Sequence, residues 1–223
     1  MAEWSRRGML TTGALTSLAL GAGLVEAAPA VSERRLSNRL ELWSTFARNS
    51  SNLLARYTST RTSPLLREAL VGSGELAFIA PASLVMRDDD PTGSRTRIDP
   101  RTIEIIPNDP SLPRRELPAR ANAPALRWLA AHLVACFAPG DGAALVADAR
   151  VEVPRGRARR LQVLPPRDSA ARAVIRGLTL TLDQVGGAVV RIQIDESDGG
   201  SFVLALADHR QQVEEQLLER VTG

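Results

Sequence analysis

The chain has 223 residues, enough for one domain of ordinary size or two small ones. Hydrophobic residues make up 44% and charged residues 24%, which excludes a wholly disordered or collagen-like chain. The formal net charge of +3, carried by 28 arginines and no lysine, is too mild to indicate a nucleic-acid-binding protein. The single cysteine, Cys136, excludes an internal disulfide and a cysteine-cluster zinc site. No uncharged apolar run reaches the roughly 20 residues that a membrane-spanning helix needs.

Residues 1–30 have the pattern of a cleaved export signal. A charged start is followed by an apolar, small-residue run over 11–25 and by the small-residue end Ala28-Pro29-Ala30. The order Ser5-Arg6-Arg7 with Met9 and Leu10 resembles a twin-arginine motif, and an ordinary secretion signal with two arginines is the alternative. Cleavage after Ala27 and cleavage after Ala30 both fit. On either route we expect the mature chain outside the cytoplasm.

The first mature element is predicted to be a helix over about 36–49. Its apolar residues Leu36, Leu40, Trp43 and Ala47 recur at intervals of four, three and four, which places them on one face of a helix.

Later segments alternate apolar and polar residues, which predicts half-buried antiparallel strands. The segments are 75–80, 103–105, 151–153, 161–163, 176–183, 190–195 and 202–206. Turn-forming residues over 165–168, 186–187 and 197–200 separate the last of them. Strands joined in order by short turns form a meander rather than a parallel crossover sheet.

Two further helices are predicted. Pro124 suits a first helical turn, and Leu126, Leu129, Leu133 and Phe137 follow at helical spacing, so this helix is expected to reach about Asp141. The segment His209–Val221 is expected to be a terminal helix. Five prolines over 107–124 predict a loop there. We therefore expect residues 31–223 to form one domain, a long curved antiparallel sheet with helices against its concave face.

Catalytic and metal-binding patterns are missing. The chain has no G-x-S-x-G elbow, no phosphate-binding glycine loop and only two histidines. His132 and Cys136 lie four apart on a helix but are better interpreted as a partly buried His and a small buried Cys. The acidic stretches 88–90 and 195–198 are interpreted as solvated turns, because calcium ligands at alternate positions are missing. We expect no enzyme, no metal and no cofactor.

Several segments, in order, resemble the LolA-type periplasmic carriers of lipoproteins. They are Leu54–Arg61 as the first strand, Ser73–Leu84, Leu161–Pro165, and Ile175–Leu182 with Val189–Gly200 as the terminal meander. The chain departs from the family at Ala80, where members commonly carry an Arg before the strand-ending Pro, and in its aromatic content of 4%. It is closest to a divergent LolA-like branch. The resemblance implies an α+β fold: an unclosed antiparallel β-barrel with helices lidding a cavity for acyl chains.

The resemblance also implies a function and partners. It predicts a periplasmic, monomeric carrier or chaperone that binds an acylated lipoprotein or another lipid, with an inner-membrane donor, an outer-membrane acceptor and no nucleic acid. The candidate ligand-binding residues are apolar and point to one face of the sheet: Leu76, Phe78, Leu84, Met86, Ile103, Ile105, Leu178, Leu180, Ile192, Ile194 and Leu204.

The alternative is a lipid-sensing envelope regulator or adaptor that contacts a membrane-anchored protein. Its contact surfaces would then be the arginine-rich hairpin, with Arg155, Arg157, Arg159 and Arg160, and the helix predicted over His209–Val221.

Overall fold

The computed structural model describes residues 27–48, 50–118, 123–156 and 158–223. Most of the predicted export signal lies outside them, so that signal and its cleavage site stay predictions. Among the described residues, no helix combines the length and the apolar character that crossing a membrane requires.

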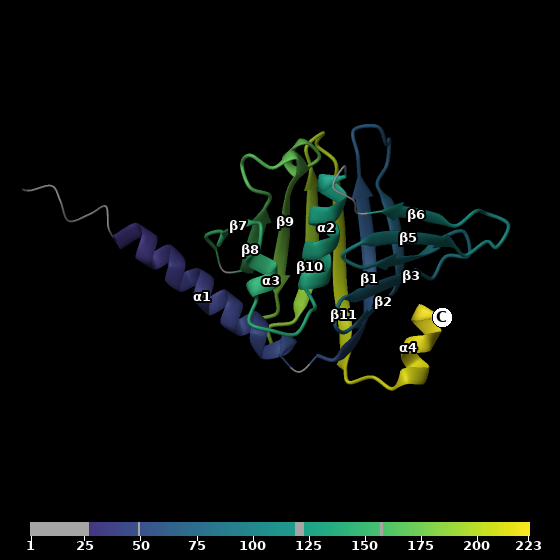
Figure 1. Cartoon of the computed structure of the whole chain (residues 1–223), viewed down its shortest axis with the longest axis horizontal. Helices are drawn as coiled ribbons and strands as arrows, with labels where there is room; N and C mark the ends of the chain where they lie inside the picture. Colours follow the sequence, from purple (N-terminus) through teal and green to yellow (C-terminus); the bar gives the residue numbers. More distant parts are fainter. Residues whose placement is uncertain (1–26, 49, 119–122, 157) are drawn as a thin grey trace, which may run out of the picture.

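Eleven strands form one sheet in which every neighbouring pair is antiparallel (Figure 1). Their order is β6-β5-β4-β3-β2-β1-β11-β10-β9-β8-β7, so all adjacent strands are chain neighbours except β1 and β11. The strands are β1 (Asn52–Thr62), β2 (Leu70–Ile79), β3 (Ser83–Asp88), β4 (Ser94–Ile98), β5 (Thr102–Pro107), β6 (Arg115–Pro118), β7 (Arg150–Glu152), β8 (Arg159–Leu164), β9 (Ile175–Leu182), β10 (Val189–Glu196) and β11 (Ser201–Gln211). The strands β6 and β7 stand at opposite ends of the order. The sheet is therefore curved but unclosed, and the predicted fold class is confirmed.

Two helices lie on the concave face, and a third reaches it with its C-terminal part and otherwise extends away from the sheet (Figure 1). The two are α2 (Pro124–Ala135) and the single turn α3 (Ala143–Val146), and the third is α1 (Ala27–Ala47). The stripe predicted for α1 is confirmed, because Trp43 and Ala47 are buried while Leu36 and Leu40 pack at the edge of the same core. The indole Nε1 of Trp43 donates a hydrogen bond to the carbonyl of Cys136, 3.0 Å away, and this ties α1 to the end of α2.

The fourth helix, α4 (Glu215–Thr222), lies on the convex face, although all helices were expected on the concave side. Leu218 and Val221 of α4 form a small separate core with Leu54, Ala77 and Val85 of the sheet. These strand residues alternate with concave-face residues such as Leu53, Leu76 and Leu84, so both faces of β1–β3 bury apolar side chains.

The helix predicted over His209–Val221 is wrong in its first part. The strand β11 continues to Gln211, where it pairs with Leu53, and α4 begins only at Glu215. The side chains at the strand end bond to a neighbouring strand and to α1 rather than along a helix of their own. His209 Nε2 lies 2.9 Å from the carbonyl of Val189, and the Gln211 amide donates to the carbonyl of Phe46 over 2.7 Å.

Two other boundaries differ from the expectations. The proline-rich segment 107–124 was expected to be a loop, but its residues Arg115–Pro118 form β6 beside β5. Proline is tolerated there because an edge strand leaves one row of N–H groups unpaired. The helix α2 starts at Pro124 as predicted but ends at Ala135, so Phe137 lies just beyond it.

Candidate functional site

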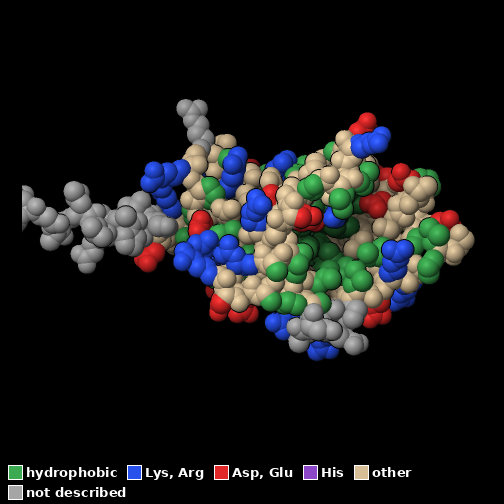
Figure 2. Space-filling model, turned by 90° about the horizontal axis from the view of Figure 1, so that it is seen from above, with side chains coloured by type: hydrophobic (Ala, Val, Ile, Leu, Met, Phe, Trp, Pro, Cys, Tyr) green, Lys and Arg blue, Asp and Glu red, His purple; other side chains and the backbone are tan. Residues whose placement is uncertain are grey.

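The concave face holds a cavity of about 660 Å³ beside α2. Its walls come from β1–β5 on one side, β10 and β11 on another, and α2 with the residue Phe137 that follows it. Figure 2, viewed from above, shows hydrophobic side chains gathered around a hollow that opens on this face. The volume falls within the range of about 300–1,000 Å³ of small-molecule sites.

Apolar side chains form the deep part of the cavity. The residues that α2 contributes are Leu129 and Leu133, one helical turn apart, and Phe137 follows at the same spacing. The facing sheet residues are Leu76, Leu84, Ile98, Ile103, Ile192, Ile194 and Leu204. A cavity with such walls favours an apolar guest, because water inside it would find few hydrogen-bond partners.

The mouth of the cavity is polar. The hydroxyl groups of Ser59, Ser94 and Thr96 and the charged groups of Arg61, Asp88, Asp90 and Glu196 belong to this part of the lining. The guanidinium of Arg61 forms a salt bridge with the carboxylate of Glu196, with 3.1 Å between the nitrogen and the oxygen. An apolar interior with a polar rim suits an amphiphile whose chain is buried and whose head stays near water.

Tyr57 is fixed between the polar rim and the interior. Its ring is buried, and its hydroxyl donates a hydrogen bond to Asp88 Oδ1 over 2.5 Å. Desolvation, and then the bond to Asp88, raises the pKa of Tyr57 far above its usual value. Asp88 also accepts from the backbone N–H of Ser94 over 2.8 Å, so it is a structural carboxylate at the β3–β4 turn.

Gly74 gives the Tyr57 ring its space. The two residues are paired across β1 and β2, and a Cβ at position 74 would lie 2.6 Å from the Tyr57 hydroxyl and also against the Arg87 carbonyl. Only glycine allows this close approach.

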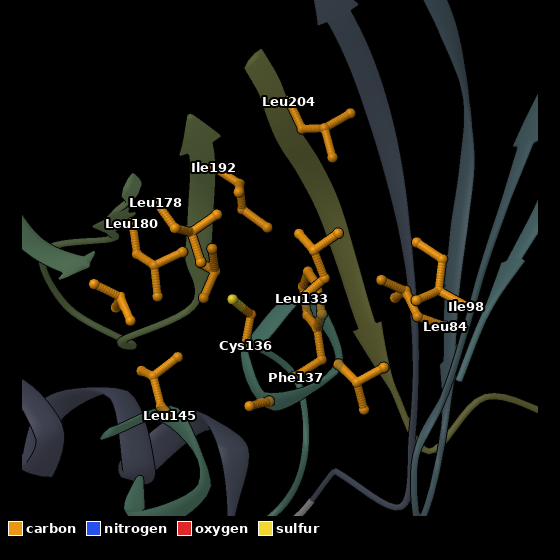
Figure 3. Packing of buried hydrophobic residues seen from close by; sticks show 14 of the residues in the cluster. Leu84, Ile98, Leu133, Cys136, Phe137, Leu145, Leu178, Leu180, Ile192 and Leu204 are labelled. Carbon is orange, nitrogen blue, oxygen red and sulfur yellow. The ribbon is translucent and has the colours of Figure 1, made fainter. Parts of the chain in front are cut away.

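Seven of the eleven candidate residues line the cavity: Leu76, Leu84, Met86, Ile103, Ile192, Ile194 and Leu204. The other four do not. Leu178 and Leu180 are wholly buried in the packed core, where they point toward α2 (Figure 3), and Phe78 is wholly buried with its ring 6.4 Å from that of Phe137. Ile105 is partly buried and packs at the edge of the core. That the seven bind a ligand remains a prediction.

Sequence reasoning missed part of the lining. Leu129, Leu133 and Phe137 were recognised as one face of a helix but not as a wall of the cavity, and Ile98 and Phe202 were not singled out. Phe202 alternates in step with Leu204, which was a usable signal. Ile98 sits in the short strand β4, where Arg95 and Arg97 obscure the alternation.

His132 and Cys136 are structural, as interpreted from the sequence. The ring nitrogens of His132 lie 2.7 Å and 3.1 Å from the carbonyls of Trp128 and Ala147, and the Cys136 thiol donates to the carbonyl of His132. Burial lowers the pKa of His132 and outweighs the hydrogen bonds to the two carbonyls, which raise it. Burial raises the pKa of the Cys136 thiol. The described residues contain no group of three or more His, Cys, Asp or Glu that could hold a metal ion.

The acidic turns are also structural. Asp90 accepts from the backbone N–H and the hydroxyl of Thr92, and Asp198 accepts from the backbone N–H of Gly200. These bonds within the turns agree with the interpretation of both stretches as hairpin ends.

No protein-family model matches the chain, and no curated protein matches it. Comparison with solved structures finds distant likenesses. A LolA superfamily protein from Nitrosomonas europaea is 10% identical, with 81% of this chain and 95% of that chain covered and a TM-score of 0.43. A putative outer-membrane lipoprotein-sorting protein domain from Vibrio parahaemolyticus is 11% identical, with 86% and 97% covered and a TM-score of 0.44.

A third similar structure is the MucA/MucB complex of Pseudomonas aeruginosa, at 16% identity, with 82% of this chain and 59% of that chain covered and a TM-score of 0.38. Likenesses this distant carry no functional argument. The architecture itself, an unclosed antiparallel sheet with helices on its concave face, is the one that the resemblance to LolA-type carriers implied.

Proposed function

We propose that the chain is a carrier or chaperone that binds the acyl chains of a lipoprotein or another lipid amphiphile. The observation that supports this most is the cavity of about 660 Å³, apolar beside α2 and polar at its mouth. Burying one methylene contributes about 0.8 kcal/mol, so a chain of about 14 carbons would gain on the order of 10 kcal/mol before ordering costs. Such binding needs no catalytic residue.

The predicted export signal would place this carrier in the periplasm. It would take an acylated cargo from an inner-membrane donor and deliver it to an outer-membrane acceptor. The seven lining candidates, together with Leu129, Leu133 and Phe137, are the residues we propose to contact the acyl chain.

The adaptor alternative is less well supported. One of its two contact surfaces was the terminal helix, but the apolar side of α4 is already occupied by the convex face of the sheet. The other, the hairpin between β7 and β8, keeps exposed arginines at Arg155 and Arg160, while Arg157 lies outside the described residues.

Titration with a fluorescent fatty acid tests the proposal. We expect stoichiometric binding, and we expect Met86→Trp to weaken it about tenfold or more, because the indole would fill space between β3 and α2. Ile106→Trp is the matched control, since Ile106 is another half-buried apolar residue but lies outside this cavity. A folded protein with a flat titration, or equal binding by the two variants, would contradict the proposal.

A further inference from the structure

The loop between β1 and β2, together with the first two residues of β2, carries four exposed aliphatic side chains. The exposed fractions are 92% for Leu65, 37% for Leu66, 57% for Leu70 and 76% for Val71. Scattered single apolar residues are normal on protein surfaces, but a contiguous group marks an interaction site. We call residues 63–71 the hairpin tip.

The hairpin tip is held in a defined turn. The backbone N–H of Leu66 donates to the carbonyl of Ser63 over 3.0 Å, and that of Leu65 donates to the Ser63 hydroxyl over 3.3 Å. Pro64 occupies the second position of this turn, which its fixed φ favours. The turn therefore presents Leu65 to solvent instead of folding it back onto the sheet.

The hairpin tip stands at the mouth of the cavity. Leu70 and Val71 themselves belong to the cavity lining, and Leu70 is paired in register with Arg61 of the polar rim. The β1–β2 hairpin stands at the upper end of the sheet in Figure 1, beside the β10–β11 turn and on the side from which Figure 2 shows the hollow. The exposed aliphatic surface is thus continuous with the apolar interior.

The chemistry of the tip favours a bilayer over a protein partner. Four aliphatic side chains bury at most a few hundred Å², whereas a stable protein interface needs about 800 Å² per partner and is rich in aromatic anchors. Insertion into lipid needs no matching surface. Among the charges near the tip, Arg61 pairs with Glu196 and Arg67 adjoins Glu68, while the exposed Asp198 stands in the β10–β11 turn, where Gly199 adjoins Pro64.

We propose that the hairpin tip inserts into the surface of a lipid bilayer, through hydrophobic burial rather than headgroup charge, and brings the cavity mouth against the acyl chains. The second part, passage of a chain into the cavity, rests on the proposed function. Insertion itself does not.

A fluorescent label tests insertion directly. Leu65→Cys labelled with an environment-sensitive dye should shift to shorter wavelength and brighten on vesicles of phosphatidylcholine, and equally on vesicles that also contain phosphatidylglycerol. Cys136 is buried and does not compete for the label. Val185→Cys is the control, because Val185 is 89% exposed in the β9–β10 turn at the other end of the sheet. No shift at position 65, or the same shift at position 185, would overturn the proposal.

Vesicle flotation with the whole chain distinguishes binding through the tip from binding through other surfaces. All variants have the same N-terminal segment, so a difference between them comes from the substituted residues. The double variant Leu65→Ser, Leu66→Ser should have a vesicle affinity at least about tenfold lower than that of the unchanged chain. The affinity of Val185→Ser should equal that of the unchanged chain. Binding confined to anionic vesicles and lost in Arg155→Gln, Arg160→Gln would instead assign membrane contact to the β7–β8 hairpin and overturn the proposal. Fatty-acid titration without vesicles should be the same for all these variants, so a failure of the cavity is recognised separately.

Discussion

The concave face of the sheet has a packed half and a hollow half, although the strands of both carry the same alternation. In the packed half, Leu161 of β8 is wholly buried in the core. Leu178 and Leu180 of β9 are wholly buried as well, near Cys136 and near Leu145 of α3 (Figure 3). In the hollow half, Leu129 and Leu133 of α2 and the following Phe137 face the cavity that lies against β1–β5, β10 and β11.

The two halves of the concave face therefore differ in what they contribute to the stability of the fold. Each fully buried leucine of the packed half contributes about 1.5–3 kcal/mol through removal from water, and this half supplies the stability. In the hollow half, Leu76, Leu84 and Ile192 are removed from water to the same degree, but they border the cavity and so lose part of their packing contacts. A void of this kind persists only where the surrounding structure is held by other contacts. The helix α1 against β7 and β8, α2 against α3 and the turn Ala170–Ala173, and α4 on the convex face supply those contacts.

The largest expected effect is on stability and should separate the halves. Leu180→Ala removes a wholly buried side chain from close packing and should lower the free energy of unfolding by about 2–5 kcal/mol. Met86→Ala, in the wall of the existing cavity, should cost about 1 kcal/mol or less, because Met86 is only half-buried. Urea denaturation measures both. Equal losses would mean that the cavity is closed in solution and that the two halves are packed alike.

A second comparison concerns two glycines in β2, both beside the cavity. Gly74→Ala places a methyl group against the Tyr57 hydroxyl and the Arg87 carbonyl, and should destabilise the fold by about 1–3 kcal/mol. It should also disturb the Tyr57–Asp88 hydrogen bond, which is visible as a lowered pKa of Tyr57 in an ultraviolet titration.

Gly72→Ala is the matched control. Its methyl group would lie 2.9 Å from the Ser59 hydroxyl, a small side chain that can rotate away, so the cost should be about 0.5 kcal/mol or less. A Gly72 variant as unstable as the Gly74 variant would show that glycine is needed along this strand for a reason other than the Tyr57 ring.

The sequence predicts which face of a strand is apolar, but not what covers that face. Leu76, Leu178 and Leu204 look alike as alternating apolar residues, and only two of them meet the cavity. The distinction depends on where α2 crosses the sheet. That position is set by contacts far apart in the chain, such as the bond from Trp43 to Cys136 across 93 positions.

The errors at element ends have a similar cause. The segment from His209 to Gln211 has a helical composition, yet pairing with β1 and bonds to Val189 and Phe46 extend β11 through it. Likewise, the prolines around β6 hide a strand that exists because β5 offers an open edge. Tertiary partners override local preference in both places.

The smallest expected effect is a pH dependence confined to the packed half. His132 links α2 to Ala147, just beyond α3, and its ring stacks on Trp128 with 4.1 Å between centroids. Because burial lowers the pKa of His132 in the fold, the unfolded chain binds a proton more readily, near pH 6.5. The stability contributed by neutral His132 is therefore complete above pH 6.5 and is lost as the pH falls below it.

Urea midpoints at pH 7.5 and pH 5.5 should then differ in the unchanged chain and converge in His132→Gln. His209 is the only other histidine and is present in both proteins, so it cancels from the comparison. Equal pH dependence in the two proteins would show that His132 is not held neutral between α2 and Ala147. Fatty-acid binding should keep its affinity in the variant, since His132 lies outside the cavity lining and only the anchoring of α2 over the packed half is weakened.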